Sequence, residues 1–167
     1  MPLHDSWERD TDQVHDEHFG RRGVTMAESV RDACEVVPMH LVLSDASVLP
    51  ITAELAFEAS DPYTVRVAFT GAHSTSTWLI GRELIAHGVL ADPSAPAGTG
   101  DVQIWRDEDP AYLLFSLSGV EGEALLAGPT EPFERFLAAT VALVPFGAES
   151  PRMEDEISRL IVSLLDA

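Results

Sequence analysis

Residues 34–80 alternate apolar and polar side chains, and this pattern restricts the fold more than any other feature of the chain. Successive side chains of a β-strand point to opposite faces, so a period of two predicts strands that bury one face and leave the other in water. The alternation is clearest in residues 37–43, 51–57 and 63–69, and residues 73–80 form a fourth expected strand. Short polar segments separate these runs, which together predict an antiparallel meander.

The middle of the chain predicts one short helix and three more strands. Residues 81–88 contain helix-forming side chains and end in Gly88, which we expect to cap the helix. Residues 91–100 are rich in Pro, Gly and Ala and predict a loop. Residues 101–106 and 111–118 then predict a hairpin, and residues 123–128 predict one further short strand.

Two helices are expected at the end of the chain. Thr130 is the expected N-cap of a helix over residues 131–143, and Ser150 is the expected N-cap of a second helix that begins at Pro151. Each helix has an apolar face with helical spacing. The two faces consist of Phe133, Phe136, Leu137, Thr140, Val141 and Val144, and of Met153, Ile157, Leu160, Ile161, Leu164 and Leu165.

The order of elements predicts an α+β fold with antiparallel strands, a short mid-chain helix and two C-terminal helices. Residues 1–32 are polar and acidic without sustained periodicity, so we expect a largely disordered tail there. Residues 33–167 form the expected domain. The chain has 167 residues, which fits one domain of this size.

The charge of the chain limits its partners. The formal net charge is −18, and residues 34–167 hold 20 acidic side chains against 6 basic ones. Nucleic-acid binding and attraction to anionic membranes both require clustered Lys or Arg, so this composition argues against both. A basic surface on another protein is a suitable partner. The alternative is that the charge only keeps the protein soluble. No signal peptide or membrane span is recognisable, which predicts a cytoplasmic protein.

The sequence contains no recognisable catalytic, cofactor-binding or metal-binding motif. Cys34 is the single cysteine and lies beside Glu35, which disfavours a reactive thiolate. Gly98-Thr99-Gly100 resembles a phosphate-binding loop, but no Lys follows it and the next expected element is a strand. We therefore expect a non-enzymatic protein with no cofactor and no metal.

Four residues are the candidates for an interaction surface. Trp78 and Trp105 lie on expected strands, where each either completes the core or contributes to an exposed protein interface. Arg82 and Asp101 lie next to strand ends, where they either orient loops or contact a partner.

Several segments, in their order and spacing, resemble the SsgA-like proteins of sporulating actinomycetes. The resemblance covers about residues 34–166. It is carried by Asp61-Pro62-Tyr63-Thr64-Val65, Phe69, Trp78, Arg82-Glu83-Leu84, Gly88, Gly98-Thr99-Gly100-Asp101-Val102, Ile104-Trp105, Glu121-Gly122-Glu123-Ala124-Leu125-Leu126, Phe136-Leu137, Thr140, Val144-Pro145, Gly147 and Glu149.

This resemblance implies a fold like the whirly single-stranded nucleic-acid-binding proteins, with two antiparallel sheets, assembled as a homotrimer. It implies a regulator of sporulation-specific cell division that binds other proteins at the septum, with no catalysis. The implied partners are division proteins, such as the tubulin-like protein FtsZ or another SsgA-like protein. The alternative function is binding of single-stranded nucleic acid, which the whirly-like fold permits and the charge opposes.

Overall fold

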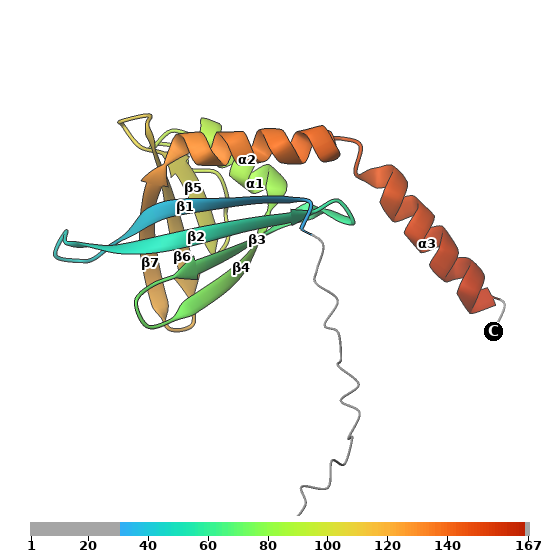
Figure 1. Ribbon diagram of the computed structural model, residues 1–167, viewed down its shortest axis with the longest axis horizontal. Helices are drawn as coiled ribbons and strands as arrows, with labels where there is room; N and C mark the ends of the chain where they lie inside the picture. Colours follow the sequence, from blue (N-terminus) through green and yellow to red (C-terminus); the bar gives the residue numbers. More distant parts are fainter. Residues whose placement is uncertain (1–30, 166–167) are drawn as a thin grey trace, which may run out of the picture.

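The computed structural model describes residues 31–165, without the side chains of residues 151–154, and it has the expected α+β architecture. The predicted order of strands, short helix, strands and two helices is confirmed (Figure 1). The elements are β1 (Ala33–Val42), β2 (Val48–Glu58), β3 (Asp61–Thr70), β4 (Thr75–Gly81), α1 (Arg82–Leu90), β5 (Val102–Arg106), β6 (Tyr112–Gly119), β7 (Gly122–Pro129), α2 (Thr130–Leu143) and α3 (Ser150–Leu165). The expected tail lies outside the described residues, apart from its last two.

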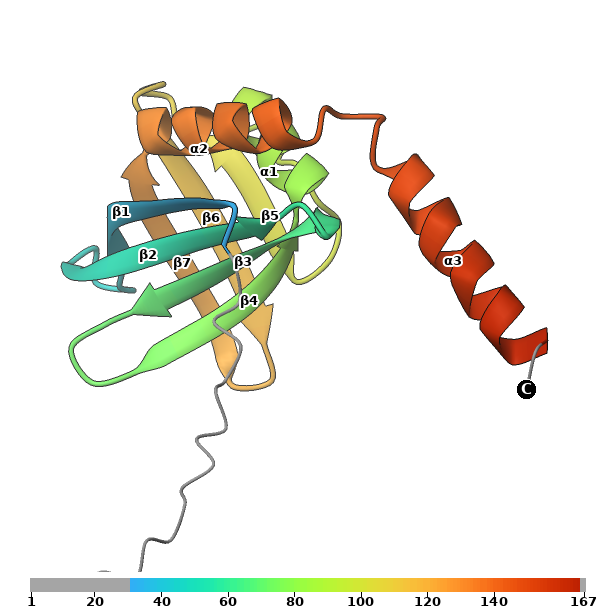
Figure 2. The ribbon, with the colours of Figure 1, turned by 45° about the vertical axis from the view of Figure 1, so that its right-hand side comes forward.

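All seven strands belong to one antiparallel sheet with the order β4-β3-β2-β1-β7-β6-β5. β1 pairs with β2 along its whole length, from Ala33 opposite Phe57 to Val42 opposite Val48. Only its last three residues, His40–Val42, pair with β7. The β1–β4 half therefore joins the β5–β7 half at a short seam, and the two halves cross (Figure 2).

The two separate sheets that the resemblance implied are thus a single hydrogen-bonded sheet in this chain. The physical reason is that β1 is ten residues long and forms backbone hydrogen bonds along both of its edges. One edge is paired throughout by β2, while the end of the other edge accepts β7.

The core lies between the two halves of the sheet and under α2. The inward phase predicted for the first three strands is confirmed, because Val37, Leu55 and Val67 are fully buried. Phe115 of β6 contacts the rings of Phe69 in β3 and Phe133 in α2, with centroids 6.4 and 5.2 Å apart. These rings therefore connect both halves of the sheet to the helix that lies across one end of them (Figure 2).

The prediction that Gly88 caps α1 is wrong, because the helix continues to Leu90 and Ala91 is its C-cap. Gly88 is buried against β5 instead. A Cβ atom added at this position would lie 2.3 Å from Cγ2 of Ile104. The absence of a side chain thus allows α1 to pack closely on β5, which is a role that helix-end rules do not reveal.

The prediction that Thr130 caps α2 is also wrong. Thr130 is the first residue of the helix, Pro129 is the N-cap, and no side chain makes a capping hydrogen bond. The Thr130 hydroxyl donates to the carbonyl of Pro110, 3.0 Å away, and its backbone N–H donates to the carbonyl of Ala111. This residue ties the start of α2 to the β5–β6 connection. The predicted second helix is present and begins at Ser150, whose capping role stays a prediction.

Candidate functional site

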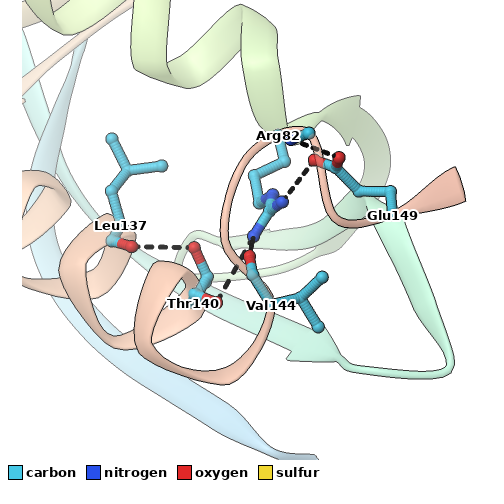
Figure 3. A network of polar contacts seen from close by, with 6 residues as sticks. Arg82, Leu137, Thr140, Val144 and Glu149 are labelled. Atoms are coloured by element: carbon cyan, nitrogen blue, oxygen red, sulfur yellow. Dashed lines mark hydrogen bonds and ion pairs between the residues drawn. The ribbon is translucent and has the colours of Figure 1, made fainter. Parts of the chain in front are cut away.

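Arg82 is the most buried charged residue of the described chain, with 1% of its surface exposed. It is the first residue of α1 and follows Gly81, the last residue of β4. This junction directs the long side chain inward, toward the C-terminal end of α2 (Figure 3). The cation therefore lies where two helices and the start of α3 approach one another.

The Arg82 guanidinium satisfies the carbonyls at the end of α2. Its Nη1 donates to the carbonyl of Val144 at 2.6 Å and to that of Thr140 at 3.3 Å (Figure 3). The Thr140 carbonyl also accepts the backbone N–H of Val144, which is the C-cap of α2, and both carbonyls lie at the negative end of the helix dipole. α2 has no basic residue in its own last turn, so Arg82 supplies the cation from another element.

Glu149 completes this arrangement. Its Oε1 accepts a hydrogen bond from Arg82 Nη2 at 2.6 Å, and its Oε2 accepts one from the backbone N–H of Gly147, also at 2.6 Å. The hydrogen bond to its own backbone N–H, followed by those from Arg82 and Gly147, lowers the pKa of Glu149 below its ordinary value, although burial acts in the opposite direction.

Two aromatic rings enclose the same cation. The guanidinium carbon of Arg82 lies 5.2 Å from the ring centre of Phe57 and 4.3 Å from that of Phe146. Both distances are within the range of cation–π attraction. We call Arg82, Glu149, Phe57, Phe146 and the carbonyls of Thr140 and Val144 the Arg82 clamp. It fixes the segment between α2 and α3, because Glu149 directly precedes the first residue of α3.

An apolar hollow of about 490 Å³ opens between the two halves of the sheet. Six strands contribute one large apolar side chain each. These side chains are Leu41, Ile51, Phe69, Trp78, Leu117 and Leu126. The β6–β7 turn forms part of its rim through Val120 and Glu121, and Gly122 turns the chain there with a φ of +133° that favours glycine. The hollow is large enough to receive several apolar side chains.

α3 presents an apolar face to solvent. Ile157, Leu160, Ile161 and Leu164 follow helical spacing, and we call them the α3 stripe; Leu160 is 59% exposed and Leu164 is 67% exposed. Asp155, Glu156 and Arg159 occupy the other side of the helix, by the same spacing. In Figures 1 and 2, α3 projects away from the body, which leaves the stripe uncovered.

The structure does not bring the four candidate residues together. Trp78 is half-buried in the hollow, and its indole N–H donates to the Ser76 hydroxyl at 3.1 Å. Trp105 is also half-buried, on the face of β5 opposite the buried Ile104. Asp101 is exposed, and its carbonyl accepts a hydrogen bond from the Ser118 N–H. A role of these three in interactions stays a prediction.

Arg82 has the contacts of a residue that orients a loop, which is one of its two expected roles. Its burial leaves almost no surface for a partner. Sequence reasoning missed the ion pair with Glu149. A signal was present, because both residues belong to the segments that carry the family resemblance, yet 67 positions separate them and no periodicity connects them.

Within the described residues we searched for metal-binding clusters and for unpaired cations. Within residues 31–165, no three His, Cys, Asp or Glu side chains lie together in a way that could hold a metal ion. Arg31, Arg82, Arg106 and Arg135 each form an ion pair with a glutamate. No helix in this part of the chain is both long and apolar enough to cross a bilayer.

Comparison with known proteins finds relatives that carry the same name. The sporulation-specific cell division protein SsgB of Streptomyces coelicolor is 39% identical over 134 residues, which are 77% of this chain and 94% of that protein. SsgB of Kineococcus radiotolerans is 31% identical over 169 residues, covering 98% of this chain and all of that protein.

Solved structures agree with the sequence comparison. The crystal structure of an SsgA-like sporulation-specific cell division protein from Thermobifida fusca superposes with a TM-score of 0.66 at 31% identity, over 75% of this chain and 93% of that one. A structure described with SsgB mutations in Streptomyces coelicolor superposes with a TM-score of 0.65 at 38% identity, over 72% of this chain and 94% of that one. The family model of the Streptomyces sporulation and cell division protein SsgA matches residues 51–149, which include both Arg82 and Glu149. The chain therefore belongs to the SsgA family of sporulation and cell division proteins.

Proposed function

We propose that this protein acts in sporulation-specific cell division by binding other proteins at the division septum. The observation that carries the proposal is the type of surface that the fold exposes, namely an apolar hollow and an apolar helix face on a strongly acidic chain. Exposed apolar patches of this kind mark sites of contact with other proteins. The relatives are named as sporulation-specific cell division proteins, which supports the same process for this chain.

We further propose that the protein is a cytoplasmic homotrimer that binds a division protein, either FtsZ or another SsgA-like protein. The exposed apolar hollow and α3 stripe support assembly, because association with copies of the same chain would remove apolar surface from water. No catalytic step is included in this function, since contact alone is sufficient to place a partner at a site.

Two measurements test the proposal on the full-length chain. Light scattering coupled to size exclusion should give three times the 18.1 kDa chain mass. Sedimentation with FtsZ polymers, and capture on an immobilised SsgA-like relative, should each be compared with an unrelated acidic protein of similar charge. Retention by neither partner above that control would refute the partner proposal, and a strict monomer would refute the trimer.

A further inference from the structure

The apolar hollow and the α3 stripe lie at different ends of the part of the chain that the structure describes. The hollow opens beside the β3–β4 connection, at Gly71 and Ser74, and beside the β6–β7 turn. α2 lies across the opposite end of the sheet (Figure 1). α3 starts at the α2 end, so its stripe begins far from the hollow of its own chain.

The Arg82 clamp fixes the N-terminus of α3 at that end. Glu149 is hydrogen-bonded at both carboxylate oxygens, and Ser150 is the next residue. No flexible linker separates the clamped residue from the helix. A helix of 16 residues spans about 24 Å. The clamp therefore fixes the point from which α3 starts, and Figures 1 and 2 show the helix directed away from the body, where its stripe is available to another molecule.

We propose that the α3 stripe of one copy docks in the apolar hollow of a second copy. Each chain then donates one helix and accepts one, which is a head-to-tail contact, and such contacts either close into rings or continue as filaments. The inference rests on the homotrimer proposed above, and it assigns the contact that would close a ring of three.

The chemistry of both surfaces favours a second copy over a basic partner. The large apolar side chains of the hollow are Leu, Ile, Phe and Trp, while Ser74, Ser76, Glu121 and Glu123 also line it. The stripe consists only of Ile and Leu. The association of two acidic chains is opposed by their like charge, so apolar burial must drive it. Salt screens the repulsion, so self-association should become tighter as ionic strength rises.

Cysteine cross-linking tests the contact directly. In a Cys34→Ser background, which removes the single native thiol, Leu164→Cys is introduced in α3 and Val120→Cys or Ser74→Cys at the rim of the hollow. The single-cysteine proteins are mixed and treated with a short bis-maleimide. We expect a cross-linked dimer in both mixtures and little in any variant alone.

The outcomes separate this inference from the proposed function. A trimer by light scattering with no cross-link in either mixture would overturn the docking while leaving the trimer intact. Cross-linking of Leu164→Cys with itself would show that the α3 helices pack together instead. A monomer that gives no cross-link would remove both the docking and the trimer.

A charge placed on the stripe provides an independent readout. Leu160→Glu should reduce the mass toward that of one chain, whereas Ser163→Glu, which adds the same charge on the polar side of α3, should keep the assembly. Circular dichroism on both variants checks that the fold is retained. Equal masses for the two variants would contradict the inference.

Discussion

At the residue scale, the Arg82–Glu149 pair should contribute more to stability than any exposed ion pair of the chain. Arg82→Met keeps an unbranched side chain and removes its charge, which leaves Glu149 and the carbonyls of Thr140 and Val144 without their cation. Breaking a buried ion pair on one side costs about 3–5 kcal/mol. Urea unfolding followed by circular dichroism should show a loss of that size.

Arg135→Met is the matched control, because Arg135 is 56% exposed and pairs with Glu35 at the surface. Exposed pairs contribute about 0–1 kcal/mol. Similar losses for the two variants would show that the burial of Arg82 has no energetic consequence, contrary to the structural argument.

Glu149 should make the free energy of unfolding depend on pH. Its pKa is lower in the folded chain than its ordinary value of 4.5, so the folded state binds this proton more weakly than the unfolded state. The stabilisation is complete above that ordinary value and is lost as pH falls through the folded pKa. The free energy of unfolding should therefore decrease in this acidic range, and Glu149→Gln should reduce that dependence. An unchanged pH profile in the variant would argue against the assigned role.

The residues of the clamp show why this site could not be predicted from sequence. Arg82 and Thr140 each look ordinary in their own helix, and Glu149 lies in a loop between two helices. Their meeting depends on how α1 packs against α2, which is a tertiary property. Hydrophobic periodicity reports only which face of an element is buried, and a buried ion pair leaves no periodic signal.

At the element scale, the packing of α1 on β5 depends on the missing side chain of Gly88. Gly88→Ala places a Cβ atom 2.3 Å from Ile104, so the helix or the strand must move. Overpacking of this kind costs about 1–3 kcal/mol, and thermal unfolding should show the loss. Gly100→Ala is the control, because no atom lies within 4 Å of its added Cβ. Equal melting temperatures for the two variants would contradict this packing.

The strands were predictable because each keeps one face in the core, so alternation in the sequence corresponds directly to burial in β1, β2 and β3. The pairing of β1 with β7 was not predictable in the same way. It joins residues about 85 positions apart through only three residue pairs. The same limit applies to the hollow, whose lining comes from six strands.

At the scale of the whole molecule, the negative net charge and the pairing of arginines with glutamates leave few unpaired cations for a polyanion to bind. The formal charge is −18, and four arginines of the described chain are paired with glutamates. Non-specific nucleic-acid binding depends on cations that neutralise phosphates, with dissociation constants of roughly 10⁻⁴–10⁻⁶ M at physiological salt. A whirly-like fold would permit such binding, but fold alone does not determine function.

We therefore expect no binding of a fluorescently labelled single-stranded oligonucleotide at physiological salt, measured by anisotropy up to about 10⁻⁴ M protein. Lower salt should not restore binding, because an acidic surface repels phosphate more strongly when screening is weaker. A known basic single-strand binder in the same assay verifies that the oligonucleotide is competent. An increase in anisotropy that weakens as salt rises would reveal a cationic surface, which the pairing of these arginines with glutamates does not predict. Such a result would favour the nucleic-acid alternative over contact with division proteins.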